Sequence, residues 1–474
     1  MKYRYTITIQ TENHPGVLYR IADLFLRRKL NIETMLVSGS EKKGISDFTI
    51  RLELEESIMV VLSKQLARIV EVINVAYKAD DGVKRTHGPS DTAAAIEISA
   101  IKKIQLLATS KKGVISLAQG IPSFQTPEYI GQAAKEAIDN HTADKYTQGF
   151  GIEPLRREIV KKVERDNGIQ AEVDNVIVTH GGIEALMAVF LGLLNIDDEI
   201  IILSPDYASH ITQTRIARHG GRPVFVALKE TTEGWILDPG KIEQAITSNT
   251  KAILISNPCN PTGKVYTKKE LKDIAKLALN YNLFIITDEM YEYFIYNGHP
   301  HVSIGSFPEV KDRVISIFGL SKSYAMTGWR IGYMIAPKDL AHHIFKIHDS
   351  LVTCPTAVSQ YAALAALQGS KKCIDHFRNE FKRRRQIVVD ALKHTDKMNL
   401  VLPEGAYYAF LKLNKEVDDN QLALDLIEEA KVAVVPGSAF GLGGAHHVRI
   451  SFGCEEDVLK EGMRRLVAYV NEKL

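Results

Sequence analysis

The sequence has few cysteines and almost no excess of charge of either sign. Its 474 residues include four cysteines, Cys259, Cys354, Cys373 and Cys454, and no two of them have the C-x-x-C spacing of a zinc site. Neither a metal site nor a disulfide framework is therefore expected, and the thiols are expected to be reduced and in or near the core. The formal net charge is only +2, and basic residues do not cluster with aromatic ones, so a nucleic-acid partner is not expected.

Long apolar runs are also missing. No uninterrupted apolar stretch approaches the roughly 18 residues of a membrane span, and residues 1–7 alternate polar and apolar side chains, unlike a secretory signal. We therefore expect a cytoplasmic protein without membrane contact. Hydrophobic residues make up 45% of the chain and charged residues 24%, which is typical of a globular protein, and a chain of 474 residues predicts two or three domains.

Residues 1–78 have the pattern of a compact βαββαβ unit. The pattern predicts helices at residues 17–29 and 57–67, and strands at Tyr3–Gln10, Ile32–Val37, Asp47–Leu54 and Val70–Tyr77. Residues 79–92 are polar, contain glycine and proline and have no apolar period, so they are predicted to form a linker.

This N-terminal unit resembles an ACT regulatory domain, and in particular that of the acetolactate synthase small subunit. The resemblance rests on Asn-His-Pro-Gly-Val-Leu at residues 13–18 and Lys-Leu-Asn-Ile-Glu at residues 29–33. It implies an amino acid effector, often valine, at an interface between paired ACT domains. The expected contacts are Asn13, Gly16, Val17 and Leu18, with Asn31 and Ile32 facing them. A domain kept only for oligomerisation is the alternative, because His14-Pro15 is also a plain helix-start signal.

From residue 93 onward, strand-like apolar runs alternate with helical ones. The strands are predicted at Asn175–Thr179, Glu199–Leu203, Pro223–Leu228, Ala252–Ser256, Leu283–Asp288 and Arg313–Phe318. Runs such as residues 200–203 are apolar on both faces, which indicates a mostly parallel α/β sheet buried between helices. Ligands bind at the carboxyl ends of the strands in such sheets. Residues from about 339 to 474 are predicted to form a smaller α+β lobe, to which the segment before residue 140 also contributes.

Polar motifs follow several of these strands. Gly181-Gly182-Ile183 opens a helix whose free N–H groups could bind an anion, although a Gly-Gly turn alone is a weak signal. Asp288 ends an apolar strand, where a buried carboxylate needs a cationic partner. Lys322 lies among small polar residues with Arg330 eight positions later. Nearby cations or burial lower the pKa of a reactive lysine, and an arginine can also bind phosphate with two hydrogen bonds.

Together these motifs resemble the class I, fold type I aminotransferases that depend on pyridoxal 5′-phosphate, and the nearest resemblance is to aromatic and broad-specificity members. The resemblance implies a homodimer and a role for each motif residue. Lys322 would bind the cofactor as a Schiff base and move the substrate proton, and Asp288 would pair with the pyridine nitrogen. The remaining cofactor contacts would be Gly181, Gly182, Ile183, Ser321 and Arg330 at the phosphate, Tyr207 against the ring, Asn260 and Tyr291 at the phenolic oxygen, and Tyr146 at the neighbouring subunit's phosphate. Arg449, Gly120 and Asn260 would bind the substrate carboxylate.

The activity implied is a ping-pong transamination between an L-amino acid and a 2-oxo acid, with 2-oxoglutarate as the expected acceptor and amino acid metabolism as the setting. Ile183 stands where aspartate-specific bacterial relatives have lysine, so strict aspartate specificity is not expected. A pyridoxal-phosphate-dependent C–S β-lyase and a catalytically silent amino-acid sensor are the alternatives. The intact set of Lys322, Asp288 and Arg449 argues against the sensor.

Overall fold

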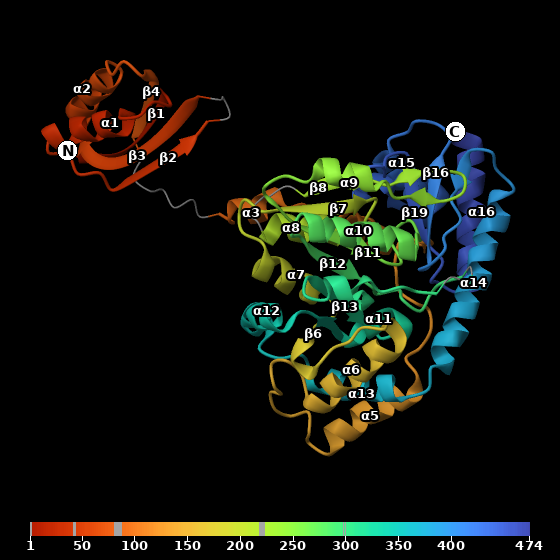
Figure 1. Cartoon of the computed structure of the whole chain (residues 1–474). Helices are drawn as coiled ribbons and strands as arrows, with labels where there is room; N and C mark the ends of the chain where they lie inside the picture. The colour runs from red at the N-terminus through yellow and green to blue at the C-terminus, as the bar shows by residue number, and fades with distance from the viewer. Residues whose placement is uncertain (1, 41–43, 80–87, 218–222, 297, 299) are drawn as a thin grey trace. The chain divides into compact units, whose positions relative to one another are not determined.

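The chain folds into two compact units, residues 1–89 and residues 90–474 (Figure 1). The computed structural model describes residues 2–40, 44–79, 88–217, 223–296, 298 and 300–474. Most of the predicted linker, residues 80–87, lies outside the described residues, and helix α3 (Asp91–Ala95) begins inside the predicted linker range.

The N-terminal unit is a four-stranded antiparallel sheet with two helices, in the order β1 (Lys2–Glu12), α1 (Val17–Arg27), β2 (Thr34–Gly39), β3 (Ile45–Glu55), α2 (Glu56–Leu66) and β4 (Val72–Ala79). The strand order is β2-β3-β1-β4. Alternate residues of β1 and β3, such as Ile7, Ile9 and Ile50, point to the helices and are fully buried together with Ile21 of α1. The predicted βαββαβ fold is confirmed.

A seven-stranded sheet organises the second unit. Its order is β6 (Val176–Thr179), β14 (Gly332–Ile335), β13 (Val314–Gly319), β12 (Phe284–Asp288), β11 (Thr250–Ser256), β7 (Glu199–Ser204) and β8 (Val224–Ala227). The strands run parallel except β14, which is antiparallel to both of its neighbours. The mostly parallel sheet was predicted from the sequence, whereas β14 was not. A four-residue apolar strand carries no local sign of its partner or direction.

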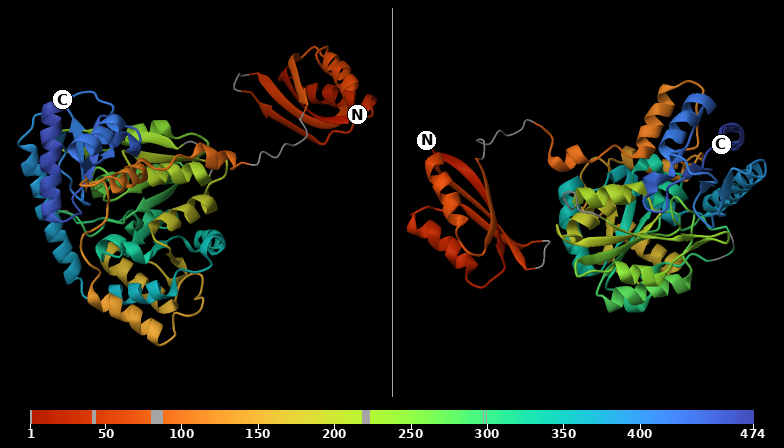
Figure 2. Two further views of the ribbon diagram at one scale, coloured as in Figure 1. Left: turned by 180° about the vertical axis from the view of Figure 1, so that it is seen from behind. Right: turned by 90° about the horizontal axis from the view of Figure 1, so that it is seen from above.

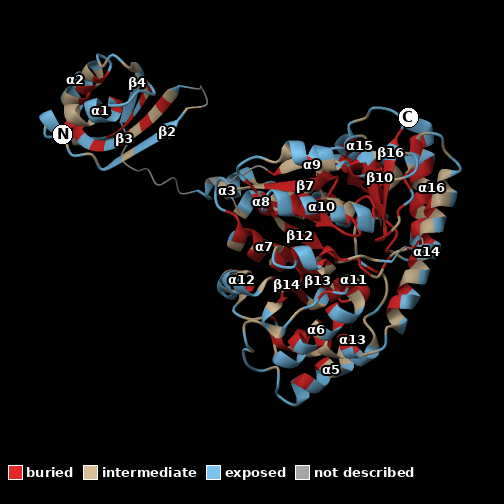
Figure 3. Cartoon of the chain, in the orientation of Figure 1, coloured by how far each residue is buried: buried red, intermediate tan, exposed pale blue. Residues whose placement is uncertain are grey.

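Helices cover both faces of this sheet (Figure 2). Ile200 and Ile202 of β7 pack with α7 (Gly182–Leu193) and α12 (Lys338–Val352) on one face. Ile201 and Leu203 belong to the core on the other face, with α6 (Glu153–Asn167), α10 (Lys268–Asn280) and α13 (Ala357–Gln368). The strands are therefore buried on both sides, as Figure 3 shows, which explains their uninterrupted apolar sequences.

A second, smaller sheet forms the C-terminal lobe, in the order β15 (Met398–Leu400), β16 (Tyr408–Leu413), β19 (His447–Ser451) and β18 (Val435–Pro436). The long helices α14 (Lys372–Leu392) and α16 (Glu456–Lys473) pack against each other beside it. A short parallel pair, β5 (Ile115–Ser116) and β17 (Val432–Ala433), joins an early segment to this lobe. The sequence placed the start of the lobe at about residue 339. In the structure α12 and α13, which follow that position, pack on α7 and on α5 (Glu128–Asp139) of the large-sheet layers.

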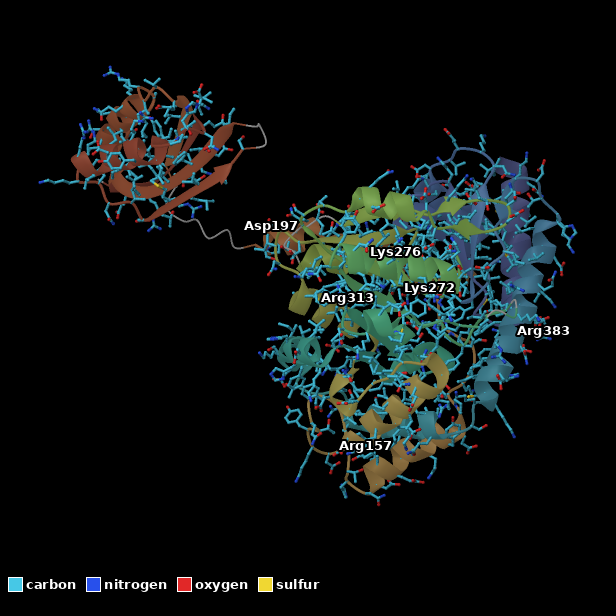
Figure 4. All side chains as sticks on the ribbon, in the orientation of Figure 1. Arg157, Asp197, Lys272, Lys276, Arg313 and Arg383 are labelled. Carbon is cyan, nitrogen blue, oxygen red and sulfur yellow. The ribbon has the colours of Figure 1, made fainter. Side chains whose placement is uncertain are left out.

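The remaining α-helices and strands connect these layers: α4 (Ala100–Ser110), α8 (Ala208–Ala217), β9 (Lys229–Glu230), β10 (Trp235–Ile236), α9 (Pro239–Ala245), α11 (Leu320–Ser323) and α15 (Asp419–Asp425). Charged side chains such as Arg157, Lys272 and Arg383 point outward from the second unit (Figure 4). In the part of the chain that the structure describes, no helix is both long and apolar enough to cross a membrane.

Candidate active site

The carboxyl ends of the parallel strands surround a cavity of about 270 Å³. The strands β7, β11, β12 and β13 end there, and each is followed directly by motif residues. The predicted site residues that line the cavity are Gly120, Gly182, Ile183, Tyr207, Asn260, Asp288, Tyr291, Ser321, Lys322, Arg330 and Arg449. Gly181 lies beside the lining, since a Cβ built on it would be 3.0 Å from Arg330 Nη2.

An anion can be held at the start of α7. Gly181 has a φ of 78°, which is favourable only for glycine, and precedes the first helical residue, Gly182. The first-turn N–H groups of this helix have no acceptor within the helix. Arg330 lies against the same turn and donates hydrogen bonds to the carbonyls of Thr327 (2.9 Å) and His180 (3.5 Å). A phosphate at this place would meet a helix N-terminus and a guanidinium, with the Ser321 hydroxyl also in the lining.

Lys322 presents an amine that loses its proton readily. Its Nζ donates a hydrogen bond of 2.6 Å to the carbonyl oxygen of Gly120. Burial and the positive charges of Arg449 and Arg330 lower its pKa to about 8, against a smaller opposing effect of Asp288. About a tenth of the amine is then neutral at pH 7, far more than for an ordinary lysine, and the neutral form is the nucleophile.

Asp288 belongs to a buried chain of acidic and basic groups. His210 of α8 lies 2.8 Å from Asp206 Oδ2 through Nδ1 and 3.1 Å from Asp288 Oδ2 through Nε2. Burial opposes the charge of His210, but the two carboxyl groups outweigh it and raise its pKa to about 10. Ser256 donates a hydrogen bond of 2.7 Å to Asp206. The chain holds Asp288 in place and presents a carboxyl group to any cation in the cavity.

Sequence reasoning missed His210 and Asp206. The signal was present, because Asp206 and His210 are four residues apart and so lie on one side of the turn that opens α8. The link to Asp288, 78 residues further along the chain, had no local signal.

Arg449 is buried at 1% exposure between the rings of Tyr408 and Phe440, 4.5 and 5.0 Å from its Cζ. Its Nη1 donates to Asn260 Oδ1 at 3.0 Å and its Nη2 to the carbonyl of Ala118. Its Nε is buried and has no hydrogen-bond partner among the described residues. A buried guanidinium with an unsatisfied donor is suited to an anionic ligand that completes its hydrogen bonds.

The predicted aromatic residues lie in two different places. Tyr207 is half-buried at the cavity, edge-on to the His210 ring at 5.4 Å, and Tyr291 is buried beside it. Tyr146, in contrast, is 86% exposed and does not line the cavity of its own chain.

Several residues of the lining were not predicted, among them Ile101 and Gln105 of α4, and Ile121. Together with the predicted Ile183 these three contribute four uncharged side chains to the lining. The cations of the lining within the described residues are Lys322, Arg330 and Arg449. The two residues that α4 contributes to the lining therefore add no charge.

The predicted effector residues lie at opposite ends of the N-terminal sheet. Asn13 follows the end of β1, where its N–H bonds to Gly44. Asn31 and Ile32 precede Glu33, which pairs with Arg4 at the start of β1. The Glu33 N–H bonds to the carbonyl of Arg51, which pairs with Thr6 of β1. With about 3.3 Å per residue, the six steps from Thr6 to Glu12 separate the two groups by roughly 20 Å. One copy of the domain cannot bring all of these residues around one amino acid. The Val17 side chain, moreover, is buried in the core, which leaves only its backbone for a ligand.

The site of the second unit has a suitable group for each of three functional groups of pyridoxal phosphate. The α7 turn and Arg330 suit the phosphate, the Lys322 amine suits the aldehyde carbon, and Asp288 suits a protonated pyridine nitrogen. The buried, unsatisfied Nε of Arg449 adds a place for a carboxylate.

Comparisons with known proteins agree with this geometry. Residues 112–466 match the family described as aminotransferase class I and II, and residues 7–74 match the AHAS small subunit-like ACT domain. The chain is 40% identical to a probable aspartate aminotransferase of Methanocaldococcus jannaschii over 77% of this chain and 95% of that relative. It is 37% identical to aromatic-amino-acid aminotransferase 2 of Thermococcus litoralis, over 81% and 98%.

Solved structures give the same result. The aspartate aminotransferase from Rhizobium meliloti aligns with a TM-score of 0.77 and 34% identity, covering 81% of this chain and 99% of that one. The aromatic aminotransferase from Pyrococcus horikoshii aligns with a TM-score of 0.73 and 35% identity, covering 78% and 99%.

Proposed function

The chain belongs to the class I and II aminotransferases, which depend on pyridoxal phosphate, and from this premise we propose that it transfers the amino group of an uncharged L-amino acid to 2-oxoglutarate in two half-reactions. The observation that carries the proposal is the convergence of Lys322, Asp288 and Arg449 on one cavity.

The cofactor, when bound, supplies an electron sink that stabilises negative charge at the substrate α-carbon. Lys322 Nζ takes and returns the proton at that carbon, since its lowered pKa lets it act as a base near neutral pH. Asp288, held by His210, would pair with the ring nitrogen. Asn260 and Tyr291 would hold the ring oxygen, and Tyr207 would cover the ring face.

Arg449 binds the substrate carboxylate. Its guanidinium is fixed by Asn260 and Ala118, so little conformational entropy is lost when the carboxylate arrives. The substrate side chain then extends toward Ile101, Ile121 and Ile183. The side chains of this wall are uncharged, so it suits aromatic and aliphatic donor side chains. The second carboxylate of 2-oxoglutarate, which uses the same pocket in the other half-reaction, would meet the Gln105 amide instead of a cation.

A panel of L-amino acids assayed with 2-oxoglutarate, pyruvate and phenylpyruvate tests the reaction and the donor class. We expect glutamate formation from aromatic and aliphatic donors, and no steady release of pyruvate and ammonia when the oxo acid is left out. Such release from a sulfur amino acid would indicate β-elimination. Borohydride reduction should add the cofactor mass at Lys322, and Lys322→Ala should lose both that adduct and several orders of magnitude in turnover. Full activity of Lys322→Ala would refute the assignment.

A homodimer with shared sites is part of the proposal. The support is that Tyr146 is exposed and does not line the cavity of its own chain, so its side chain could reach the phosphate of a second chain. Mixing Tyr146→Ala with Lys322→Ala subunits should give hybrid dimers that keep one intact site. No recovery of activity beyond that of the separate variants would contradict sharing. A cytoplasmic location stays a prediction.

Regulation by an amino acid bound to the N-terminal unit is the last part of the proposal. Because Asn13 and Asn31 lie at opposite ends of one sheet, the effector site would combine Asn13, Gly16 and Leu18 of one chain with Asn31 and Ile32 of another. A coupling of about 1–3 kcal/mol would change the apparent substrate affinity by roughly 5- to 150-fold.

Calorimetry with valine, leucine, isoleucine and the aromatic amino acids tests this regulation on the intact protein. Asn13→Ala and Asn31→Ala should each abolish binding. Asn74→Ala, an exposed asparagine on β4 of the same domain, is the matched control and should bind normally. If no amino acid binds, or if a protein starting at Ser90 keeps the same kinetics and effector response, the domain serves assembly instead.

A further inference from the structure

Two buried tyrosine hydroxyls meet at the floor of the cavity. Tyr291 Oη and Tyr408 Oη are 2.7 Å apart, and the two rings are nearly perpendicular, at 82° with centroids 5.6 Å apart. Tyr291 follows β12 of the large sheet, whereas Tyr408 begins β16 of the small lobe. The bond therefore joins the two lobes across the cavity that both residues line.

Tyr408 also contacts two other functional groups. The Arg449 guanidinium lies over its ring, with Cζ 4.5 Å from the centroid. Gly120, whose carbonyl accepts a hydrogen bond from the Lys322 amine, lies against the Tyr408 ring. A Cβ built on Gly120 would be 2.9 Å from Tyr408 Cζ and closer still to the hydroxyl. The glycine leaves the room that the phenol occupies. The Tyr408 side chain thus contacts three groups of the site: Gly120, which holds the Lys322 amine, the Arg449 guanidinium, and Tyr291.

We propose that Tyr408 is a positioning residue whose hydroxyl donates to Tyr291 and whose ring supports Arg449. The inference rests on the proposed function, because it assumes that Tyr291 donates to the cofactor's ring oxygen. A hydroxyl has one proton, so a Tyr291 that donates to the cofactor must accept from Tyr408. Its bond to the ring oxygen is then strengthened, because hydrogen bonds in a chain polarise one another.

The two parts of the side chain have separable effects. Through Tyr291, the hydroxyl would stabilise the anionic form of the cofactor's ring oxygen. It would therefore lower the pH at which the proton shared by this oxygen and the Lys322 nitrogen is lost. The ring stabilises the Arg449 guanidinium through a cation–π contact and therefore acts on carboxylate binding. Tyr408→Phe removes the first effect and keeps the second, whereas Tyr408→Leu removes both.

Absorbance titration of the holoenzyme measures the first effect. The midpoint of the visible spectral change should rise by about 0.2–0.5 pH units in Tyr408→Phe, since the cooperative part of a hydrogen bond is roughly 10–30% of its strength. Tyr291→Phe should raise it by about one unit. The double variant should match Tyr291→Phe, because Tyr408 acts only through Tyr291. The KM for the 2-oxo acid should stay within about twofold in Tyr408→Phe and rise several-fold in Tyr408→Leu.

Tyr296→Phe is the matched control. The Tyr296 hydroxyl is also buried and donates to the carbonyl of Ala406, two residues before Tyr408, but it does not line the cavity. This variant should be less stable to heat than the wild-type enzyme and keep its spectral midpoint.

An unchanged or lowered midpoint in Tyr408→Phe overturns the role of the hydroxyl, and an additive double variant shows that it does not act through Tyr291. An unchanged KM in Tyr408→Leu overturns the role of the ring. These outcomes leave transamination intact. If the wild-type protein binds no pyridoxal phosphate, the proposed function fails and this inference fails with it.

Discussion

The acidity of Lys322 in the cofactor-free protein is a direct test of the site's electrostatics. The pKa falls from 10.5 to about 8 because the amine is buried and faces Arg449 and Arg330. At roughly 1.4 kcal/mol per unit, this difference corresponds to about 3 kcal/mol against the charged form. At pH 7.5 about a quarter of the amine would be neutral, compared with about one in a thousand for an ordinary lysine, an increase of roughly 200-fold.

Competitive acetylation of the apoprotein by a trace of acetic anhydride measures this fraction. The labelling of Lys322 is followed by mass spectrometry from pH 6 to 11 and compared with that of Lys269, whose side chain is 88% exposed. We expect a midpoint near pH 8 for Lys322. Arg449→Met removes the stronger of the two repelling effects and should raise the midpoint toward 10.5 without reaching it, because burial remains. A wild-type midpoint near 10 would refute the reasoning.

The same lowered pKa predicts how apoprotein stability varies with pH. Between about pH 8 and 10.5 the unfolded chain holds a proton on Lys322 that the folded protein has released. The contribution of Lys322 to stability therefore rises with pH across this window, and below pH 8 the folded protein bears the full cost of the buried charge. Urea denaturation at pH 7.5 and 10 measures the free energy of unfolding of wild type and of Lys322→Met. The variant should be more stable than wild type at pH 7.5, and this difference should be smaller at pH 10. A difference that is the same at both values would contradict the prediction.

Three further predictions follow from single contacts. Asp288→Ala removes the partner of the ring nitrogen, so the single-turnover rate of proton abstraction should fall by at least 100-fold; an unchanged rate would show that another group does this work. Gly120→Ala places a methyl against Tyr408 and should cost about 1–3 kcal/mol of stability in thermal unfolding, part of which Tyr408→Phe should restore in the double variant. The Lys162 ammonium lies 2.5 Å from the buried Glu292 carboxylate, so Lys162→Met leaves that carboxylate without its cation. The free energy of unfolding in urea should fall by about 3–5 kcal/mol. A fall below about 1 kcal/mol would mean that the other partners of Glu292 suffice.

The sequence by itself determined the order of the elements and the places where chemistry occurs. Apolar runs such as residues 200–203 required burial on both faces, and this alone indicates a parallel sheet between helices. Asp288 ends a strand, and Gly181 and Lys322 follow strand ends within three residues. The carboxyl ends of parallel strands lie at one edge of the sheet. Their convergence could therefore be predicted, because a short segment carries both the strand pattern and the functional residue.

Only the tertiary structure decided which groups from different segments touch. The insertion of β14 between β13 and β6, the bond from His210 to Asp288 and the pairing of Tyr408 with Tyr291 join residues tens to more than a hundred positions apart. The register of β1 with its neighbours likewise separates Asn13 from Asn31, which motif reading had grouped. Contacts of this kind depend on strand pairing and lobe packing, and these are set by burial summed over the whole chain, so no local residue pattern encodes them.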